Sequence, residues 1–215
     1  MKARPILFSG PMVQALLAGW KTQTRRVLRE NWGPAHSLER SYDPERQQFQ
    51  FCTQDGWQDC SAPPCPYGKP GDLLIVREAF SGPWGCRNLK PSEWPVRCPI
   101  WYWADGNPYF GDWTKPKPSI HMPRWASRLT LRITDVRVER LQEISPADAK
   151  AEGDHERSGM PEYYERGAMC HVDWYRHLWG QINGPDSWAA NPWVWVIGFE
   201  AIRENVDQVT GGRAA

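Results

Sequence analysis

The sequence predicts one α+β domain built on a curved or barrel-like mixed β-sheet. Its 215 residues are enough for a single domain with elaborations. Strand-like and helix-like segments follow one another irregularly instead of in regular βαβ units. Hydrophobic residues make up 40% and charged residues 24% of the chain, which is a globular composition. No apolar run reaches the length of a membrane span, so we expect no membrane partner.

The first elements are a helix and a strand. Pro11 stands at a favoured first helical position, Gly19 ends the segment, and apolar residues between them fall on one helical face. Residues 22–27 alternate and are rich in Thr and Val, which predicts a strand. Residues 73–80 are a short apolar run after a Pro-Gly turn, which predicts a strand buried on both faces.

The second half of the chain predicts a longer strand, two helices and a closing strand. Residues 128–141 alternate strictly, with a slip near Asp135 that predicts a β-bulge. Helices are predicted from Ser145 to Gly153, where a hydroxyl cap precedes Pro, and over 172–182. Residues 193–202 are so rich in β-forming residues that they predict a core strand.

Two loop-rich insertions interrupt these elements, at about 29–70 and 81–126. Both are rich in Gly and Pro and lack sustained periodicity. Within them we predict only a short hairpin around 49–52 and Trp57, and a strand over 100–104. The domain therefore spans 1–203, and 204–215 are predicted to be a flexible tail.

Charge and composition limit the partners. The formal net charge is +1, so any nucleic acid must be met by a local basic surface. Residues 1–29 and 113–134 contain bases and no acid, whereas 135–165 are acidic; solvated faces and a functional basic surface both explain this sorting. The apolar stretch near the N-terminus is interrupted and lacks a cleavage site, which predicts a cytoplasmic protein.

Cysteine and tryptophan content bear on the kind of site. The six Cys residues lack the paired spacing of zinc ligands, so neither a metal nor a cofactor is expected. The chain has 14 Trp residues, which serve either as core or as platforms on which bases stack.

Chemistry is concentrated where the first helix ends. If Lys21 lies in the turn, its amine can approach the Thr24 hydroxyl, and a desolvated, neutral Lys can activate that hydroxyl as a nucleophile. Strict strand alternation would instead place Lys21 on the opposite face, on an exposed edge strand with solubilising cations.

The pattern Gly19-x-Lys21-x-x-Thr24-x-Arg26 resembles the G-x-K-x-x-[E/T]-x-R signature of ASCH domains, in the longer form met in phage and prophage genomes. The order of the remaining segments is similar too. The resemblance implies a PUA-like mixed β-barrel with flanking helices. It also implies a cleft that binds RNA or a nucleobase. Some members are amidohydrolases that act on N4-acylated cytidine, and ribonuclease activity is known for others.

The resemblance also implies site residues. Lys21 and Thr24 match two catalytic positions, but Arg132 stands where a central-strand Glu is expected, so Glu78 is the substitute we predict. Arg132 then forms either a structural ion pair or an anion site. The predicted nucleic-acid-binding residues are Arg25, Arg26, His121, Arg124, Trp125 and Arg132.

Three functions follow from the sequence. The first is binding of RNA, single-stranded nucleic acid or a modified nucleoside in this cleft. The second is an amidohydrolase or ribonuclease that uses Lys21 and Thr24. The third is a noncatalytic phage accessory role, in which the Trp-rich insertions bind a protein partner.

Overall fold

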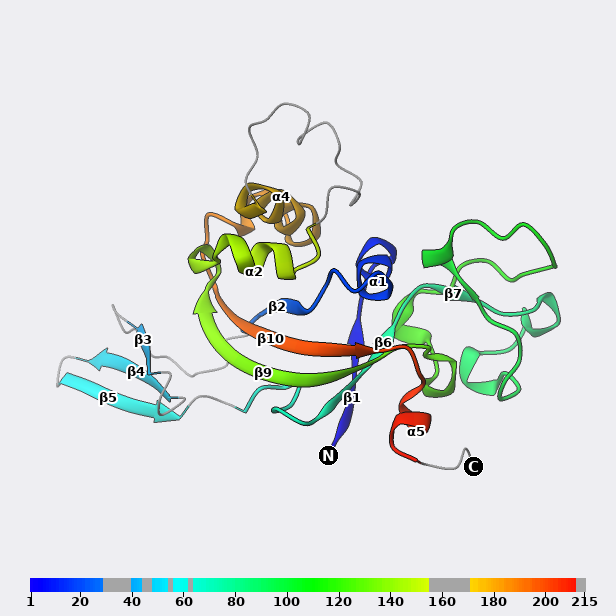
Figure 1. Cartoon of the computed structure of the whole chain (residues 1–215), viewed down its shortest axis with the longest axis horizontal. Helices are drawn as coiled ribbons and strands as arrows, with labels where there is room; N and C mark the ends of the chain where they lie inside the picture. Colours follow the sequence, from blue (N-terminus) through cyan, green and yellow to red (C-terminus); the bar gives the residue numbers. More distant parts are fainter. Residues whose placement is uncertain (29–39, 44–47, 54–55, 62–63, 155–170, 212–215) are drawn as a thin grey trace.

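The computed structural model describes residues 1–28, 40–43, 48–53, 56–61, 64–154 and 171–211 (Figure 1). Its strands are β1 (Ala3–Leu7), β2 (Gln23–Val27), β3 (Arg40–Asp43), β4 (Gln48–Thr53), β5 (Gly56–Ser61), β6 (Leu73–Arg77), β7 (Phe80–Ser81), β8 (Trp101–Tyr102), β9 (Thr130–Arg140) and β10 (Trp193–Ile202). Its α-helices are α1 (Gly10–Leu17), α2 (Pro146–Ala151), α4 (His171–Asn183) and α5 (Val206–Val209). Short 3-10 helices occupy Trp84–Cys86, Pro91–Glu93, Trp103–Asp105, Ser119–His121, Arg124–Ala126, Leu141–Glu143 and Pro185–Ser187.

The main sheet has five strands in the order β1-β6-β9-β10-β2. Only β1 and β6 pair in parallel, so the sheet is mixed. The expected α+β class and mixed sheet are confirmed. The closed barrel is wrong, because β1 and β2 are edge strands with no ladder between them among the described strands. A side chain spans this opening instead, where Arg26 Nη2 donates to the Leu7 carbonyl at 2.8 Å.

The strongly curved strands β9 and β10 carry two apolar cores, one on each face (Figure 1). Alternate residues of β10, such as Trp195 and Ile197, join α1 and β6 in the first core. The residues between them, Val194 and Val196, pack with α2 and α4 in the second. This double burial explains the uninterrupted apolar sequence of β10. The predicted bulge is present, because the β9 register shifts opposite Gly198.

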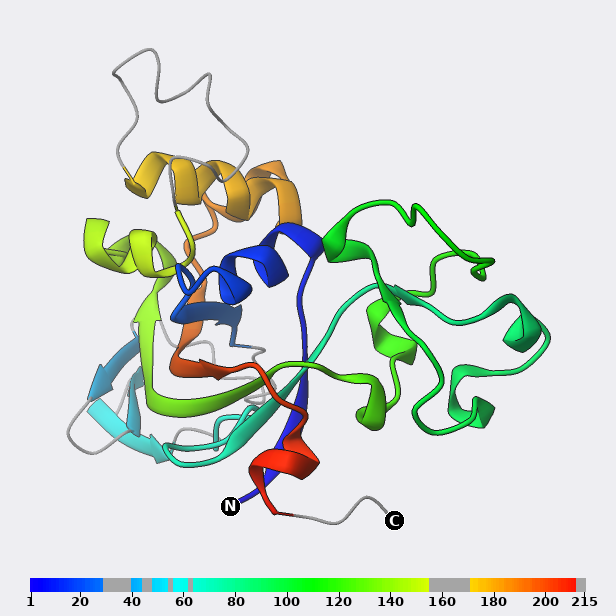
Figure 2. The ribbon, with the colours of Figure 1, turned by 45° about the vertical axis from the view of Figure 1, so that its right-hand side comes forward.

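The insertion at 81–126 forms a lobe on the far side of α1 from α2 and α4 (Figure 2). It has its own small core around Phe80, Trp94 and Met122. The strand predicted over 100–104 is shorter than expected, because only Trp101–Tyr102 pair with β7 before the chain enters a 3-10 turn.

The other insertion is described only in part. The predicted hairpin is present, since β4 pairs with β5 in register from Gln48 opposite Ser61 to Thr53 opposite Gly56. The segments 29–39, 44–47, 54–55 and 62–63, which also fall in the predicted insertion at 29–70, lie outside the described residues.

Both ends of the chain hold structure that the sequence did not predict. The strand β1 lies in a region for which no element was predicted, and β1 pairs in register with the whole of β6. The tail predicted from 204 contains α5, which is capped by the Asn205 side chain. Val206 is fully buried against Leu73 and Ile75, so this helix is anchored by apolar packing. No helix in the described part of the chain is both long and apolar enough to cross a membrane.

Candidate functional site

The exit of α1 turns Lys21 inward. Gly19 has a φ of +77°, a backbone conformation that glycine adopts without strain. The N–H groups of Trp20 and Lys21 then both donate to the Ala15 carbonyl, at 2.9 and 3.2 Å. Lys21 therefore lies in the turn before β2, as the nucleophile hypothesis required, and it is only 2% exposed.

Lys21 is held by Glu152 at the end of α2. Its Nζ lies 2.8 Å from the Glu152 Oε2 atom and 2.8 Å from the Glu152 carbonyl oxygen. Gly153 allows this approach, because a Cβ at that position would lie 3.1 Å from the Ala15 side chain. Burial lowers the pKa of Lys21, and the attraction of Glu152 opposes that shift only in part. The neutral amine is therefore more accessible than in an exposed lysine.

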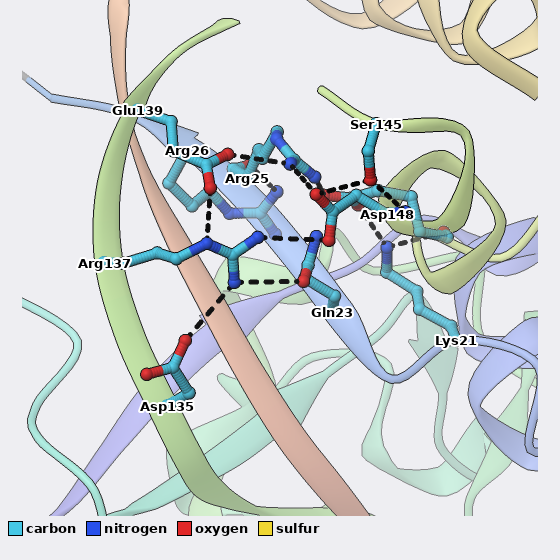
Figure 3. Close-up of polar contacts among 10 residues, drawn as sticks. Lys21, Gln23, Arg25, Arg26, Asp135, Arg137, Glu139, Ser145 and Asp148 are labelled. Atoms are coloured by element: carbon cyan, nitrogen blue, oxygen red, sulfur yellow. Dashed lines mark hydrogen bonds and ion pairs between the residues drawn. The ribbon is translucent and has the colours of Figure 1, made fainter. Parts of the chain in front are cut away.

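Arg25 is fully buried in an ion-pair network behind Lys21 (Figure 3). Its guanidinium lies 3.2 Å from Glu152, 3.1 Å from Glu139 and 3.4 Å from Asp148. Arg137 extends the network by bonding both Glu139 and Asp148. Buried charges persist when opposite charges surround them, so this network fixes α2 against β2 and β9. Arg25, predicted to bind nucleic acid, is thus enclosed by carboxylates.

A narrow cleft of about 80 Å³ opens beside the Lys21–Glu152 pair. Thr24, which is 2% exposed, lines it together with Arg26. The other wall comes from α4, where Tyr175 and Trp179 lie one turn apart. The complete lining is Phe8, Met12, Lys21, Thr24, Arg25, Arg26, Val27, Glu152, Tyr175, Leu178, Trp179, Ile182 and Asn183.

Two residues that line this cleft have polar groups with unused hydrogen-bonding capacity. The buried indole Nε1 of Trp179 has no hydrogen-bond partner in the described part of the chain. Within the described residues, Arg26 donates only to the carbonyls of Leu7 and Arg25 and makes no ion pair with a carboxylate. Its guanidinium also lies over the Phe8 ring, 5.1 Å from the centroid. Burial raises the pKa of Tyr175 well above its usual value, so its phenol stays neutral.

Glu78 does not line this cleft. Its carboxylate is bound at 2.8 and 2.9 Å by Arg128, which also binds Asp105. Burial raises the pKa of Glu78. The carboxylate that contacts Lys21 is that of Glu152, so the structure places Glu152 where Glu78 was expected.

The remaining predicted binding residues lie elsewhere. Arg132 is half-exposed on β9 and pairs with Glu200 at 3.2 Å, which matches the structural ion-pair alternative. Arg124 binds Asp207, which lies in α5, and His121 is exposed. Trp125 packs against the small core of the 81–126 lobe.

Sequence reasoning missed Glu152, Tyr175 and Trp179. The two aromatic residues had a detectable signal, because they share a helix face with Leu178 and Ile182. Glu152 had none beyond its place at the end of a predicted helix, since it lies 131 residues from Lys21. Three or more metal-ligating side chains do not gather anywhere in the described part of the chain.

Comparison of the chain with protein-family models, with curated proteins and with solved structures gave no match. The resemblance to ASCH domains therefore rests on the motif and the order of segments. The function must be argued from the geometry of the cleft.

Proposed function

We propose that this protein binds a nucleobase in the narrow cleft, as part of RNA, single-stranded nucleic acid or a modified nucleoside. The observation that carries the proposal is the convergence of Lys21, Thr24 and Arg26 on one cleft with aromatic rings in its walls. Cations beside aromatic faces are what recognition of an unstacked base requires.

The polar groups of the cleft favour one kind of base edge. Trp179 offers an unused N–H, Thr24 a hydroxyl, and Lys21 a third position that Glu152 does not occupy. A base that presents a carbonyl oxygen and a ring nitrogen, as a pyrimidine does, satisfies these donors. An apolar ligand of equal size leaves the indole N–H unpaired, which disfavours it.

Equilibrium titration of N4-acetylcytidine and of a short single-stranded RNA tests this proposal. The variant Thr24→Val keeps the shape of the side chain and removes its hydroxyl, and we expect it to weaken binding about 5- to 10-fold. The matched control Thr22→Val changes an exposed hydroxyl two residues away and leaves affinity unchanged. Absence of binding by the wild type, or equal effects of both variants, contradicts the proposal.

A second candidate function, amide hydrolysis, is favoured by the Lys21–Glu152 contact. Two of the three hydrogen-bonding directions of Lys21 Nζ point at Glu152 oxygens. When the amine is neutral, its lone pair occupies the third direction and can accept the proton of the Thr24 hydroxyl. Thr24 Oγ then adds to the acyl carbon of N4-acetylcytidine while its proton passes to Lys21 Nζ. As the C–N bond breaks, this proton goes to the leaving amine. Water hydrolyses the resulting threonyl ester to acetate and restores Thr24.

Chromatography of N4-acetylcytidine incubated with the protein separates hydrolysis from binding alone. Hydrolysis predicts cytidine and acetate in equal amounts, at a rate that increases with pH as Lys21 loses its proton. Lys21→Met should lower the rate at least about 100-fold, as expected for a group that acts in proton transfer. Labelled RNA incubated in parallel tests the ribonuclease alternative. Binding with no turnover of either compound rejects hydrolysis and leaves the first proposal.

A further inference from the structure

A second, wider hollow of about 630 Å³ adjoins the narrow cleft. It lies at the opening between the edge strands β1 and β2, beside the start of α1. The residues that line both spaces are Phe8, Met12, Arg26, Ile182 and Asn183. The two spaces therefore adjoin along a common wall, to which Arg26 belongs.

The hollow is positively charged. Arg26 and Arg77 line it, and none of the described residues that line it is acidic. The Arg77 Nη1 atom donates to the Ile120 carbonyl at 3.0 Å, but its buried Nε has no partner in the described part of the chain. Neither arginine makes an ion pair with a described carboxylate.

Within the described residues, Arg87, Arg97, Arg140 and Arg203 likewise lack a carboxylate partner, but Arg26 and Arg77 are the two arginines that line one hollow. Six other arginines each bind at least one carboxylate: Arg4, Arg25, Arg124, Arg128, Arg132 and Arg137. Two guanidinium groups with no carboxylate partner among the described residues lie on the wall of one hollow, which leaves a site for an anion supplied by a ligand. Guanidinium groups match the oxygens of phosphate in charge and in fork geometry.

The start of α1 adds neutral donors to the same wall. Ser9 is the N-cap residue, yet its side chain makes no capping bond, and it lines the hollow. The first turn of α1 contains no acidic residue that would compete for an anion. The positive end of the helix dipole therefore adds to the charge of the two arginines.

We propose that the wide hollow is a phosphate subsite, and that the ligand is a nucleotide or a nucleic-acid strand instead of a free nucleoside. The inference rests on the proposed function, because it assumes that a base occupies the narrow cleft. The phosphate then lies between Arg26 and Arg77, with the Ser9 hydroxyl as a further donor. The sugar spans the shared wall between the two spaces.

Calorimetric titration tests the subsite with ligands that share one base and carry no phosphate, a phosphate monoester or a phosphate diester. The probes are N4-acetylcytidine, its 5′-monophosphate and a dinucleoside monophosphate with the same base. We expect the wild type to bind either phosphorylated probe about 10- to 100-fold more tightly than the nucleoside, as charge-assisted hydrogen bonds imply. Tighter binding of the monoester identifies a free nucleotide, whereas equal or tighter binding of the diester identifies a strand.

Arg77→Gln should abolish this preference and leave nucleoside affinity unchanged, and Arg77→Lys should retain part of it. The matched control Arg87→Gln removes an equal charge from an exposed arginine of the 81–126 lobe and should have no effect. Equal affinity of the wild type for nucleoside and nucleotide overturns the inference, as do equal losses in Arg77→Gln and Arg87→Gln. Thermal unfolding of each variant confirms that it folds.

Titration with inorganic phosphate separates failure of the subsite from failure of the proposed function. If no base binds but inorganic phosphate does, with an affinity that Arg77→Gln lowers about tenfold or more, the anion site stands and the base-binding proposal fails. If nucleosides bind while inorganic phosphate and the nucleotide phosphate contribute nothing, base binding stands and the subsite is overturned.

Discussion

Replacing Glu152 by Gln should destabilise the fold strongly and in a pH-dependent manner. The wild-type carboxylate lies 2.8 Å from Lys21 Nζ and 3.2 Å from Arg25 Nη1, and all three side chains are at most 3% exposed. Arg25 keeps Glu139 and Asp148 in the variant, whereas Lys21 loses its only carboxylate within the described structure. The loss of folding stability in Glu152→Gln therefore comes mainly from the unpaired charge of Lys21.

Breaking a buried ion pair by removing one partner costs about 3–5 kcal/mol. The Gln amide oxygen still accepts one hydrogen bond from Lys21, so we expect the lower end of that range, about 3 kcal/mol at pH 7. That difference is roughly a 150-fold change in the unfolding equilibrium constant. This loss of stability is relieved when Lys21 loses its proton, because no unpaired charge is then buried.

The pH dependence follows from the lowered pKa of Lys21. Between that folded pKa and the unfolded value of 10.5, the unfolded chain binds more protons, so stability increases with pH. Loss of Glu152 lowers the folded pKa further and extends this window to lower pH. The destabilisation by Glu152→Gln should therefore be smaller at pH 10 than at pH 7, because a larger fraction of Lys21 is neutral at the higher pH.

Urea unfolding at pH 7 and pH 10 measures both effects. The control Asp135→Asn removes an exposed carboxylate bound to Arg137 in the same network and should change stability by less than about 0.5 kcal/mol. The double variant Lys21→Met/Glu152→Gln should lose less stability than the sum of the single variants. A loss below about 1 kcal/mol at pH 7, or one that grows with pH, refutes this account of the pair.

Three further predictions concern residues in and outside the cleft. Glu78→Gln should cost at most about 1 kcal/mol, because Arg128 keeps Asp105. Burial raises the pKa of the Glu78 carboxyl group, so the free energy of unfolding should decrease as the pH rises above 4.5. Urea titrations of Glu78→Gln should not show this decrease. Trp179→Phe should weaken N4-acetylcytidine binding about 5- to 10-fold in calorimetry, while Trp188→Phe, outside the cleft lining, should not. Val206→Ala should lower the unfolding free energy by about 1–2 kcal/mol, and no loss would mean that α5 does not pack as described.

The sequence predicted those elements whose pattern is long or capped. Alternation over β9, including the bulge, and the capped start of α2 both carry a local physical signal. The strand β1 was missed because it has five residues and contains Pro5, which a central strand disfavours but an edge strand accepts. The helix α5 was missed because four residues carry no periodicity.

The candidate site was predictable only on one side. Lys21, Thr24 and Arg26 lie close in sequence, so the local turn brings them together. The opposite wall depends on how α2 and α4 pack over the sheet, which no local pattern determines. Glu78 was predicted as the carboxylate of the cleft because of its place after a strand. No local pattern indicated that Arg128 binds this carboxylate instead.

Nuclear magnetic resonance of the indole N–H groups tests the central claim most directly. In ¹⁵N-tryptophan-labelled protein, the signal of Trp179 is assigned by its loss in Trp179→Phe. Addition of N4-acetylcytidine 5′-monophosphate should shift the Trp179 signal and leave those of Trp101 and Trp113, in the exposed aromatic cluster of the 81–126 lobe, unchanged. Shifts confined to Trp101 and Trp113 would show that ligand binds the lobe, and would contradict a base site in the narrow cleft.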